Sequence, residues 1–326
     1  MSEHFRDIIR HDNEAKGCLV QRWQGLPSMD HGWRGCRVTD GAMTTVGVLV
    51  PNCNYARYLP ERLASIRLQD KSVDAVVFLD DASTDGSWDI AQAALQDFTC
   101  PVFAHANAIN SGNVLRQWQL GLEQLETDLV WIAEADDRAA PGLLACLVAR
   151  FEADPKAILA FCDSRAIDAQ GETTAADSQA YYAAHGDNGL AQDGLFDAQD
   201  FAKRFLCPRN LLVSVSATLW RRSVLTAALA RLEAEMPEWL CAGDWRTYLE
   251  ACEPGGMVHF VAAPLNEHRR HAASVTGRTP RSRHFAEVVA MHVTLRNRFG
   301  PQPERDAAMR RHLAELRQAW ALDAAA

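Results

Sequence analysis

Three apolar runs of strand length end in polar, mostly acidic residues whose types suggest shared chemistry. They are residues 46–50, followed by Pro51; residues 75–79, followed by Asp80 and Asp81; and residues 129–133, followed by Glu134, Asp136 and Asp137. Ligands of an open parallel sheet bind just outside the carboxyl ends of its strands, so we expect these ends to line one crevice. Hard divalent cations favour carboxylate oxygens and pair with phosphates, which points to metal-assisted phosphate chemistry.

Each acidic pair also has an ordinary structural explanation. Asp80 and Asp81 are residues that hydrogen-bond the backbone of a turn. Glu134 and Asp136 are residues that favour the start of a helix. Capping explains either pair alone, but not the presence of both at strand ends.

Strand-like and helix-like segments alternate around these runs. Further strands are expected at residues 101–104, 158–162, 211–220 and 258–261, and helices at about residues 59–66, 87–95, 114–125, 141–151, 222–235 and 239–251. This alternation predicts an α/β fold, with a mostly parallel sheet covered by helices on both faces. Residues 166–200 lose the pattern and are expected to form a loop or lid.

Regular apolar spacing identifies core positions. Trp118 and Trp131 have apolar neighbours at regular spacing, so we assign both to the core. The tail is expected to be helical, and its last helix has Met309, Leu316 and Trp320 on one face.

The composition is that of a globular chain and excludes some classes of partner. The 326 residues are 48% hydrophobic and carry a formal net charge of -9, which argues against nucleic acid as a partner. Nine cysteines without a Cys-x-x-Cys pair, and a charged start, predict reduced thiols in a cytoplasmic protein. No 18 apolar residues run together, so no transmembrane segment is expected. Peripheral contact with the inner face of a membrane stays open.

Taken together, the motifs resemble glycosyltransferase family 2, the inverting nucleotide-sugar transferases. The similar segments follow the order of that family: residues 51–59 (PNCNYARYL), 80–87 (DDASTDGS), 110–118 (NSGNVLRQW), 134–137 (EADD), 243–245 (GDW) and 269–276 (RRHAASVT). The resemblance implies a GT-A fold, a Rossmann-like and mostly parallel sheet flanked by helices, with helices at the C-terminal end. The expected domains are an extension (1–43), a glycosyltransferase domain (44–280) and a helical tail (281–326).

The resemblance also implies roles for individual residues at the donor site. Pro51 and either Asp80 or Asp81 would hold the base of the nucleotide, and Asn110 and Arg116 would line its pocket. Glu134 would face the ribose or the sugar.

Other roles implied by the resemblance concern the diphosphate, the metal and the base. Arg270 would hold the diphosphate, with Arg269 as a second candidate. Asp136 would bind Mn²⁺ or Mg²⁺, and His271 would complete the metal shell. Asp244 would be the catalytic base that takes the proton of the acceptor hydroxyl.

Two positions depart from the pattern of the family. Cys53 stands where an aromatic residue is usual, so base stacking is not expected there. Gly243 stands where a Glu usually precedes the catalytic base.

The function implied is metal-dependent transfer of a sugar from a nucleoside-diphosphate sugar to a hydroxyl of a glycan or lipid-linked glycan, in bacterial surface-polysaccharide synthesis. Two alternatives stay open. One is a nucleotide-sugar-binding or scaffold protein without turnover. The other is a sugar nucleotidyltransferase, for which the Gly-rich phosphate loop expected near the first strand is missing.

Overall fold

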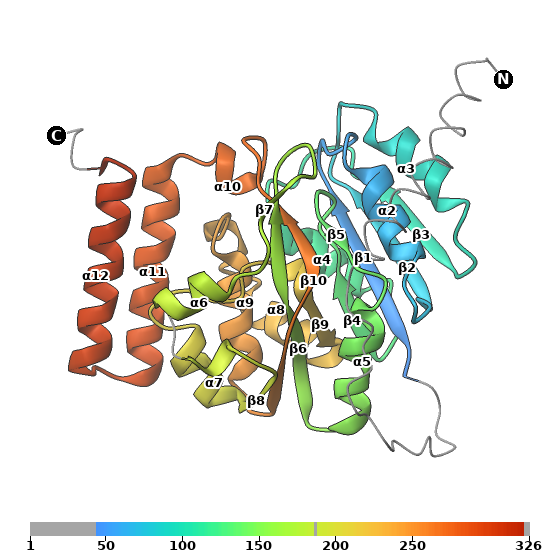
Figure 1. The fold of residues 1–326 in the computed structure, drawn as a ribbon. Coiled ribbons are helices and arrows are strands. Elements are labelled where there is room, and N and C mark those ends of the chain that lie inside the picture. Colours follow the sequence, from blue (N-terminus) through green and yellow to red (C-terminus); the bar gives the residue numbers. More distant parts are fainter. Residues whose placement is uncertain (1–43, 186–187, 323–326) are drawn as a thin grey trace. The chain divides into compact units, whose positions relative to one another are not determined.

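A computed structural model describes residues 44–185 and 188–322 of the chain (Figure 1). The extension expected at residues 1–43 lies outside the described residues, so its role stays a prediction. The described part is built on one mixed sheet, whose main strand order is β3-β2-β1-β4-β9-β6-β10-β5.

Four parallel strands form one half of this sheet. They are β1 (Val46–Asn52), β2 (Ala75–Asp80), β3 (Val102–Ala106) and β4 (Leu129–Ile132). β1 lies between β2 and β4, and β3 pairs with the outer side of β2. The strands predicted here are confirmed. The register places Asn52 opposite Asp80, so the polar residues after β1 and β2 emerge at the same edge.

The other half of the sheet mixes strand directions. β9 (Thr218–Arg221) runs antiparallel to both β4 and β6 (Ala157–Ile167). β10 (Met257–Arg269) runs parallel to β6 along nearly its whole length. The short strands β5 (Arg138–Ala139) and β8 (Gly194–Asp197) pair with β10, and β7 (Thr173–Ala175) pairs with β6.

Helices connect the strands and cover the sheet (Figure 1). They are α2 (Leu59–Arg67), α3 (Ser87–Leu95), α4 (Val114–Leu122), α5 (Leu143–Ala153), α6 (Gln179–His185), α7 (Ala198–Phe205), α8 (Arg222–Leu232), α9 (Gly243–Cys252), α10 (Val275–Arg278), α11 (Arg281–Phe299) and α12 (Pro303–Ala319). Short 3₁₀ turns lie at Asn188–Leu190, Val215–Ala217 and Met236–Glu238.

The hydrophobic core confirms the assignments made from spacing. Trp118 and Trp131 are both buried. Gly121 of α4 lets that helix lie directly on β1, because a Cβ at this position would fall 2.2 Å from Cδ1 of Leu49. The sequence thus places a residue without a side chain where the helix and strand come closest.

The last two helices pack on the same core as the sheet. Val288, Met291 and Leu295 of α11 and Met309 of α12 are buried members of that core. Figure 1 shows α11 and α12 side by side at one end of the described part. The tail expected to be helical therefore continues the main hydrophobic core.

Two predictions of local structure were wrong in part. Residues 166–200 were expected to form a loop or lid, but they contain the end of β6, β7, α6 and β8, because short paired segments satisfy the backbone without an apolar pattern. Residues 211–220 were expected to form one strand, but only their last residues belong to β9. A 3₁₀ turn precedes it, where Ser214 caps the turn by accepting a hydrogen bond from the backbone N–H of Ser216.

No helix in the described part of the chain combines the length and the apolar character needed to cross a bilayer.

Candidate active site

The loops after β1 and β2 are tied together by Asp80 and its neighbours. Asp80 is buried, accepts a hydrogen bond from Nδ2 of Asn52 (2.6 Å) and accepts another from the backbone N–H of Ser83 (2.9 Å). Ser83 in turn accepts the backbone N–H of Asn54 at 2.8 Å. Asp80 therefore organises the loops and orients the groups around it.

Asp81 holds the segment that follows β3. Its carboxylate accepts hydrogen bonds from Asn107 (2.7 Å), from Gln117 (3.1 Å) and from both the backbone N–H and the hydroxyl of Ser111 (2.8 Å each). Asn110 donates to the backbone carbonyl of Asp81 at 2.8 Å. The structure thus brings Asp81 and Asn110 together.

The other predicted donor-site residues have different surroundings. Cys53 accepts a 3.1 Å hydrogen bond from Asn110, and burial together with the charge of Asp81 raises the pKa of its thiol. Pro51 is buried inside β1, opposite Leu79. Arg116 is exposed on α4.

The acidic loop after β4 meets the end of β10. Nε2 of His271 lies 2.9 Å from Oδ2 of Asp136, so the two predicted metal ligands are side by side. Asp137 accepts the backbone N–H of Arg269 (2.8 Å) and the hydroxyl of Ser214 (3.0 Å). The loop is therefore held by residues far away in the sequence.

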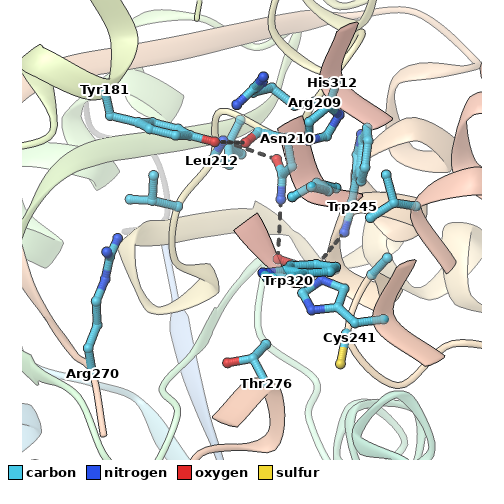
Figure 2. A pocket seen from close by; sticks show the side chains of 16 residues that line it. Tyr181, Arg209, Asn210, Leu212, Cys241, Trp245, Arg270, Thr276, His312 and Trp320 are labelled. Carbon is cyan, nitrogen blue, oxygen red and sulfur yellow. Dashed lines mark hydrogen bonds between the residues drawn. The ribbon is translucent and has the colours of Figure 1, made fainter. Parts of the chain in front are cut away.

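Successive residues at the end of β10 point in different directions. Arg269 donates to the backbone carbonyl of Asp136 (2.7 Å) and forms an ion pair with Glu61 (2.7 Å). His271 points the same way, toward Asp136. Arg270, between them, instead lines a cavity beside Asp244 (Figure 2).

A buried arginine under the acidic loop was missed by the sequence reasoning. Arg62 of α2 is fully buried, and its guanidinium lies 4.6 Å from the ring centroid of Trp131. Its nitrogens have no hydrogen-bond partner among the described residues. Burial lowers its pKa to about 10, while the charges of Asp137 and Glu134 act in the opposite direction. A charged residue on the inward face of α2, between Leu59 and Ile66, was the available signal.

Glu134 occupies a position that disfavours its charge. Burial, and then the charges of Asp136 and Asp137, raise its pKa to about 8. Its backbone N–H donates to the hydroxyl of Ser216 at 3.1 Å, and Ser216 also accepts the indole N–H of Trp131 through its carbonyl (2.7 Å). A nearby cation would favour the ionised form of these carboxylates.

The ligand set suits a divalent cation that is shared with a phosphate-bearing substrate. Within residues 44–185 and 188–322, no three His, Cys, Asp or Glu side chains form a metal cluster of their own. Asp136 and His271 nevertheless offer an oxygen and a nitrogen 2.9 Å apart. Neighbouring ligands of an octahedral ion at 2.0–2.1 Å lie about 3 Å apart, and Mg²⁺ sites commonly take their remaining ligands from phosphates and water. Imidazole suits Mn²⁺ better than Mg²⁺.

Asp244 lies at the start of α9 and lines a cavity of about 310 Å³. Figure 2 shows the side chains that surround this cavity. The carboxylate of Asp244 accepts a hydrogen bond from its own helix, at the backbone N–H of Trp245 (2.6 Å), and one from Asn210 (3.3 Å). Burial raises its pKa to about 6 despite these hydrogen bonds. A carboxylate with raised proton affinity that faces a cavity is suited to accept a proton.

The wall of this cavity is largely apolar and aromatic. Tyr181, Trp245 and Trp320 contribute rings, and Leu212 and Leu316 contribute aliphatic groups. Flat apolar surfaces of this kind pack against the faces of sugar rings, while Asp244 and Arg270 supply polar groups at the edge.

Tyr248 of α9 is fully buried near both Asp244 and Glu134. Burial, and then the charges of Asp244 and Glu134, raise the pKa of Tyr248. Both carboxylates therefore act on the same tyrosine, one turn along α9 from Asp244. Tyr55 similarly responds to Asp136 and Glu134, with burial as the main cause of its raised pKa.

Comparison with known proteins agrees with this geometry. The family model described as "Glycosyl transferase family 2" matches residues 47–217, over half of the chain. The abequosyltransferase RfbV of Salmonella typhimurium is 29% identical over 122 residues, which are 37% of this chain and 36% of that protein. An uncharacterised glycosyltransferase of Nostoc sp. is 32% identical over 110 residues, 33% of each chain. The matched segments thus span about a third of the length of these curated relatives.

Solved structures extend the likeness beyond the matched segment. S. aureus TarS 1-349 in complex with UDP-GlcNAc has a TM-score of 0.59 at 14% identity, over 85% of this chain and 73% of that one. The mannosyltransferase PcManGT of Pyrobaculum calidifontis, in complex with GDP-Man and Mn²⁺, has a TM-score of 0.55 at 19% identity, over 99% and 84% of the two chains. These likenesses confirm the predicted GT-A fold. By its match to the family model over more than half its length, the chain belongs to glycosyl transferase family 2.

Proposed function

We propose that this protein is an inverting glycosyltransferase that moves a sugar from a nucleoside-diphosphate sugar to a hydroxyl of a glycan or lipid-linked glycan. The observation that carries the proposal is Asp244. It faces a cavity large enough for a sugar ring and has its pKa raised to about 6. Family membership supports the donor class.

The reaction would be one in-line displacement. The acceptor oxygen attacks the anomeric carbon while its proton passes to Asp244, and the bond between that carbon and the diphosphate oxygen breaks. No covalent intermediate with the enzyme forms. General-base assistance of this type contributes about 10²–10⁴-fold in rate.

The donor would occupy the loops after β1, β2 and β4. Pro51, Asp80 and Asp81 would hold the base, either directly or by fixing the loops, and Asn110 and Arg116 would complete the nucleotide pocket. Glu134 would contact the ribose or the sugar. These roles are supported by the hydrogen bonds that join Asp81 with Asn110 and Asp80 with the loop after β1.

The leaving diphosphate needs its growing charge neutralised. Asp136 and His271 would hold Mn²⁺ or Mg²⁺ for this purpose, and a bound cation supplies electrostatic stabilisation of that charge. Arg270, which lines the cavity beside Asp244, would meet the diphosphate from the acceptor side. The setting we propose is bacterial surface-polysaccharide synthesis in the cytoplasm, at the inner face of the membrane.

The proposal is tested by Asp244→Asn. We expect transfer to fall by at least about 100-fold while donor binding is retained, because only the proton acceptor is lost. UDP-GlcNAc and GDP-mannose with Mn²⁺ are suitable donors for the assay, with release of nucleoside diphosphate as the readout. Release of pyrophosphate from a nucleoside triphosphate would instead identify a nucleotidyltransferase. Donor binding without transfer to any acceptor of a broad panel would identify a binding or scaffold protein.

The metal assignment has its own test. We expect chelation with EDTA, or Asp136→Ala, to suppress transfer, and Mn²⁺ to restore it only in the chelated wild-type enzyme. Full activity in excess chelator would contradict the assignment.

A further inference from the structure

A glutamate of the C-terminal helices reaches the loop from which the Asp244 helix starts. Glu287 of α11 is only 3% exposed. Its Oε2 accepts three consecutive backbone N–H groups, those of Leu240 (3.0 Å), Cys241 (2.8 Å) and Ala242 (2.9 Å). Its Oε1 accepts a hydrogen bond from Nε of Arg283 at 3.2 Å. Both oxygens of the carboxylate are thus occupied.

These three N–H groups lie where a helix needs an acceptor. The first N–H groups of a helix, and those of the turn leading into it, have no partner within the helix. Ala242, at the N-cap of α9, has no side chain that can serve. A carboxylate at this end also interacts favourably with the helix dipole. Glu287 therefore supplies, from α11, the acceptor for the N-cap residue of α9 and for the two residues before it.

The same carboxylate acts on Asp244 through its charge. Glu287 contributes to the raised pKa of Asp244, after burial as the main cause, since a nearby negative charge disfavours a second one. The other groups around Asp244 are Asn210, which donates to it, and Tyr248. Cys241, the cationic Arg209 and Arg270, and His284 and His312 line the same cavity. Arg209 is paired with Glu315 at 2.6 Å, and burial lowers the pKa of both histidines.

We propose that Glu287 is a positioning residue for Asp244, which fixes residues 240–242 so that the base keeps its place at the cavity and which strengthens the base by its negative charge. The proposal rests on the proposed function for its catalytic meaning. It makes α11, outside the segment matched by the family model, part of the machinery for proton transfer. Two variants separate the two effects.

Glu287→Leu tests the hold on the loop. Removal of the acceptor leaves three N–H groups without their partner, so we expect their amide hydrogens to exchange about 10- to 100-fold faster, as for the loss of hydrogen bonds to a charged group. Exchange is followed by mass spectrometry on peptides that contain residues 240–242. This measurement needs no substrate, so it tests whether Glu287 holds the loop even if the protein shows no sugar transfer. Unchanged exchange would overturn the proposal.

Glu287→Gln tests the charge with little change of shape. The amide oxygen can still accept the backbone N–H groups, so the fold is retained, but the negative charge is gone. We expect the titration of the Asp244 carboxyl, followed by ¹³C NMR, and the acidic limb of kcat/KM to move to lower pH. We also expect the plateau of kcat/KM to fall several-fold, because a weaker base accepts the proton less readily.

Glu304→Gln is the matched control. It removes the same charge from an exposed position in the first turn of α12, away from the loop. We expect the control to leave amide exchange, the titration of Asp244 and the pH profile as in the wild type. The charge effect would be overturned if Glu287→Gln lost activity equally at every pH while the acidic limb of kcat/KM and the titration of Asp244 stayed in place. Glu287 would then have a merely structural role.

Discussion

At the scale of single residues, Asp244 is half-buried at the cavity, and the task proposed for it needs its charge. Its pKa of about 6 lies well above the ordinary value of 3.8, because burial favours the neutral form. Such a base is still mostly ionised at neutral pH, yet holds a proton more strongly than an exposed carboxylate. Ideal catalytic pKa values lie near the working pH.

The activity should therefore depend on pH. Only the ionised form of Asp244 accepts a proton, so we expect kcat/KM to decline below about pH 6, tenfold for each further unit. The measurement is a pH–rate profile with saturating metal, and donor binding over the same range serves as the control. A profile that stays flat down to pH 4.5 would exclude Asp244 as the base.

The same residue should reduce the stability of the fold. The pKa of Asp244 is higher in the folded state than in the unfolded chain, so ionisation of this carboxyl destabilises the fold. This loss of stability is absent below the pKa of the unfolded chain and is fully present above about pH 6. Asp244→Asn should therefore raise the free energy of unfolding by ~1–3 kcal/mol at pH 7.5 and much less at pH 4.5. Urea denaturation at the two pH values measures this. An equal change in the free energy of unfolding at both pH values would contradict the link between stability and the ionisation of Asp244.

The residue types at the strand ends predicted that the carboxylates after β2 and β4 would share one crevice, and the family resemblance added Asn110 and His271 as site residues. In the structure Asn110 contacts Asp81, and His271 contacts Asp136. Arg62 and Glu287 escaped prediction. Each is a charged residue on a helix, where sequence spacing indicates only which side is inward. What a buried charge contacts depends on elements far away in the chain.

The departure at Gly243 has a local explanation in the structure. A Cβ at this position would lie 3.2 Å from Cγ and Cδ1 of Leu115, a core residue of α4. The side chain that usually precedes the base would therefore have to displace the packing between α9 and α4.

At the scale of elements, the parallel half of the sheet was predicted well because β1, β2 and β4 are buried on both faces and read as continuous apolar runs. The antiparallel half was predicted poorly. β7, β8 and β9 have only three or four residues each, too few for a period to appear. Their partners are fixed by β6 and β10, which lie far away in sequence.

The contact between α4 and β1 offers a test of packing. Gly121→Ala should lower the free energy of unfolding by ~1–3 kcal/mol, because the new methyl group would overlap the buried side chain of Leu49. The higher helix propensity of Ala compared with Gly would offset up to ~1 kcal/mol of this loss. Urea denaturation provides the measurement.

Gly142→Ala is the matched control for this substitution, since the nearest atom to its Cβ would be 3.8 Å away, on Asp70. We expect a change within about 0.5 kcal/mol, as for an uncrowded site. Similar losses in both variants would show that crowding at Leu49 is not the cause.

At the scale of the whole molecule, the candidate site combines residues inside and outside the segment matched by the family model. The family model ends at residue 217, and Asp244, Arg270 and His271 lie beyond it. The loops after β1, β2 and β4 belong to the matched part. The cavity beside Asp244 is lined both by residues of that part, such as Tyr181 and Asn210, and by residues of α9, α11 and α12 beyond it.

Donor binding should stabilise the entire described domain. A ligand that binds only the folded state adds ~2.7 kcal/mol at a concentration of 100 Kd. We expect a nucleoside-diphosphate sugar with Mn²⁺ to raise Tm, and the metal-dependent part of this rise to vanish in Asp136→Ala. A thermal-shift screen of UDP- and GDP-sugars, with and without Mn²⁺, provides the measurement. Equal shifts with and without metal in the wild type would argue against a shared cation.

The alternation at the end of β10 makes the two arginines there sensitive to chain length. Loss of one residue from the strand ahead of them would exchange their orientations, so that Arg270 would take the place beside Glu61 and Arg269 would be withdrawn from it. Because both residues are arginines, this exchange of places would leave the overall charge and composition of the chain almost unchanged. We therefore infer that insertions and deletions are tolerated far less well in this strand than point substitutions.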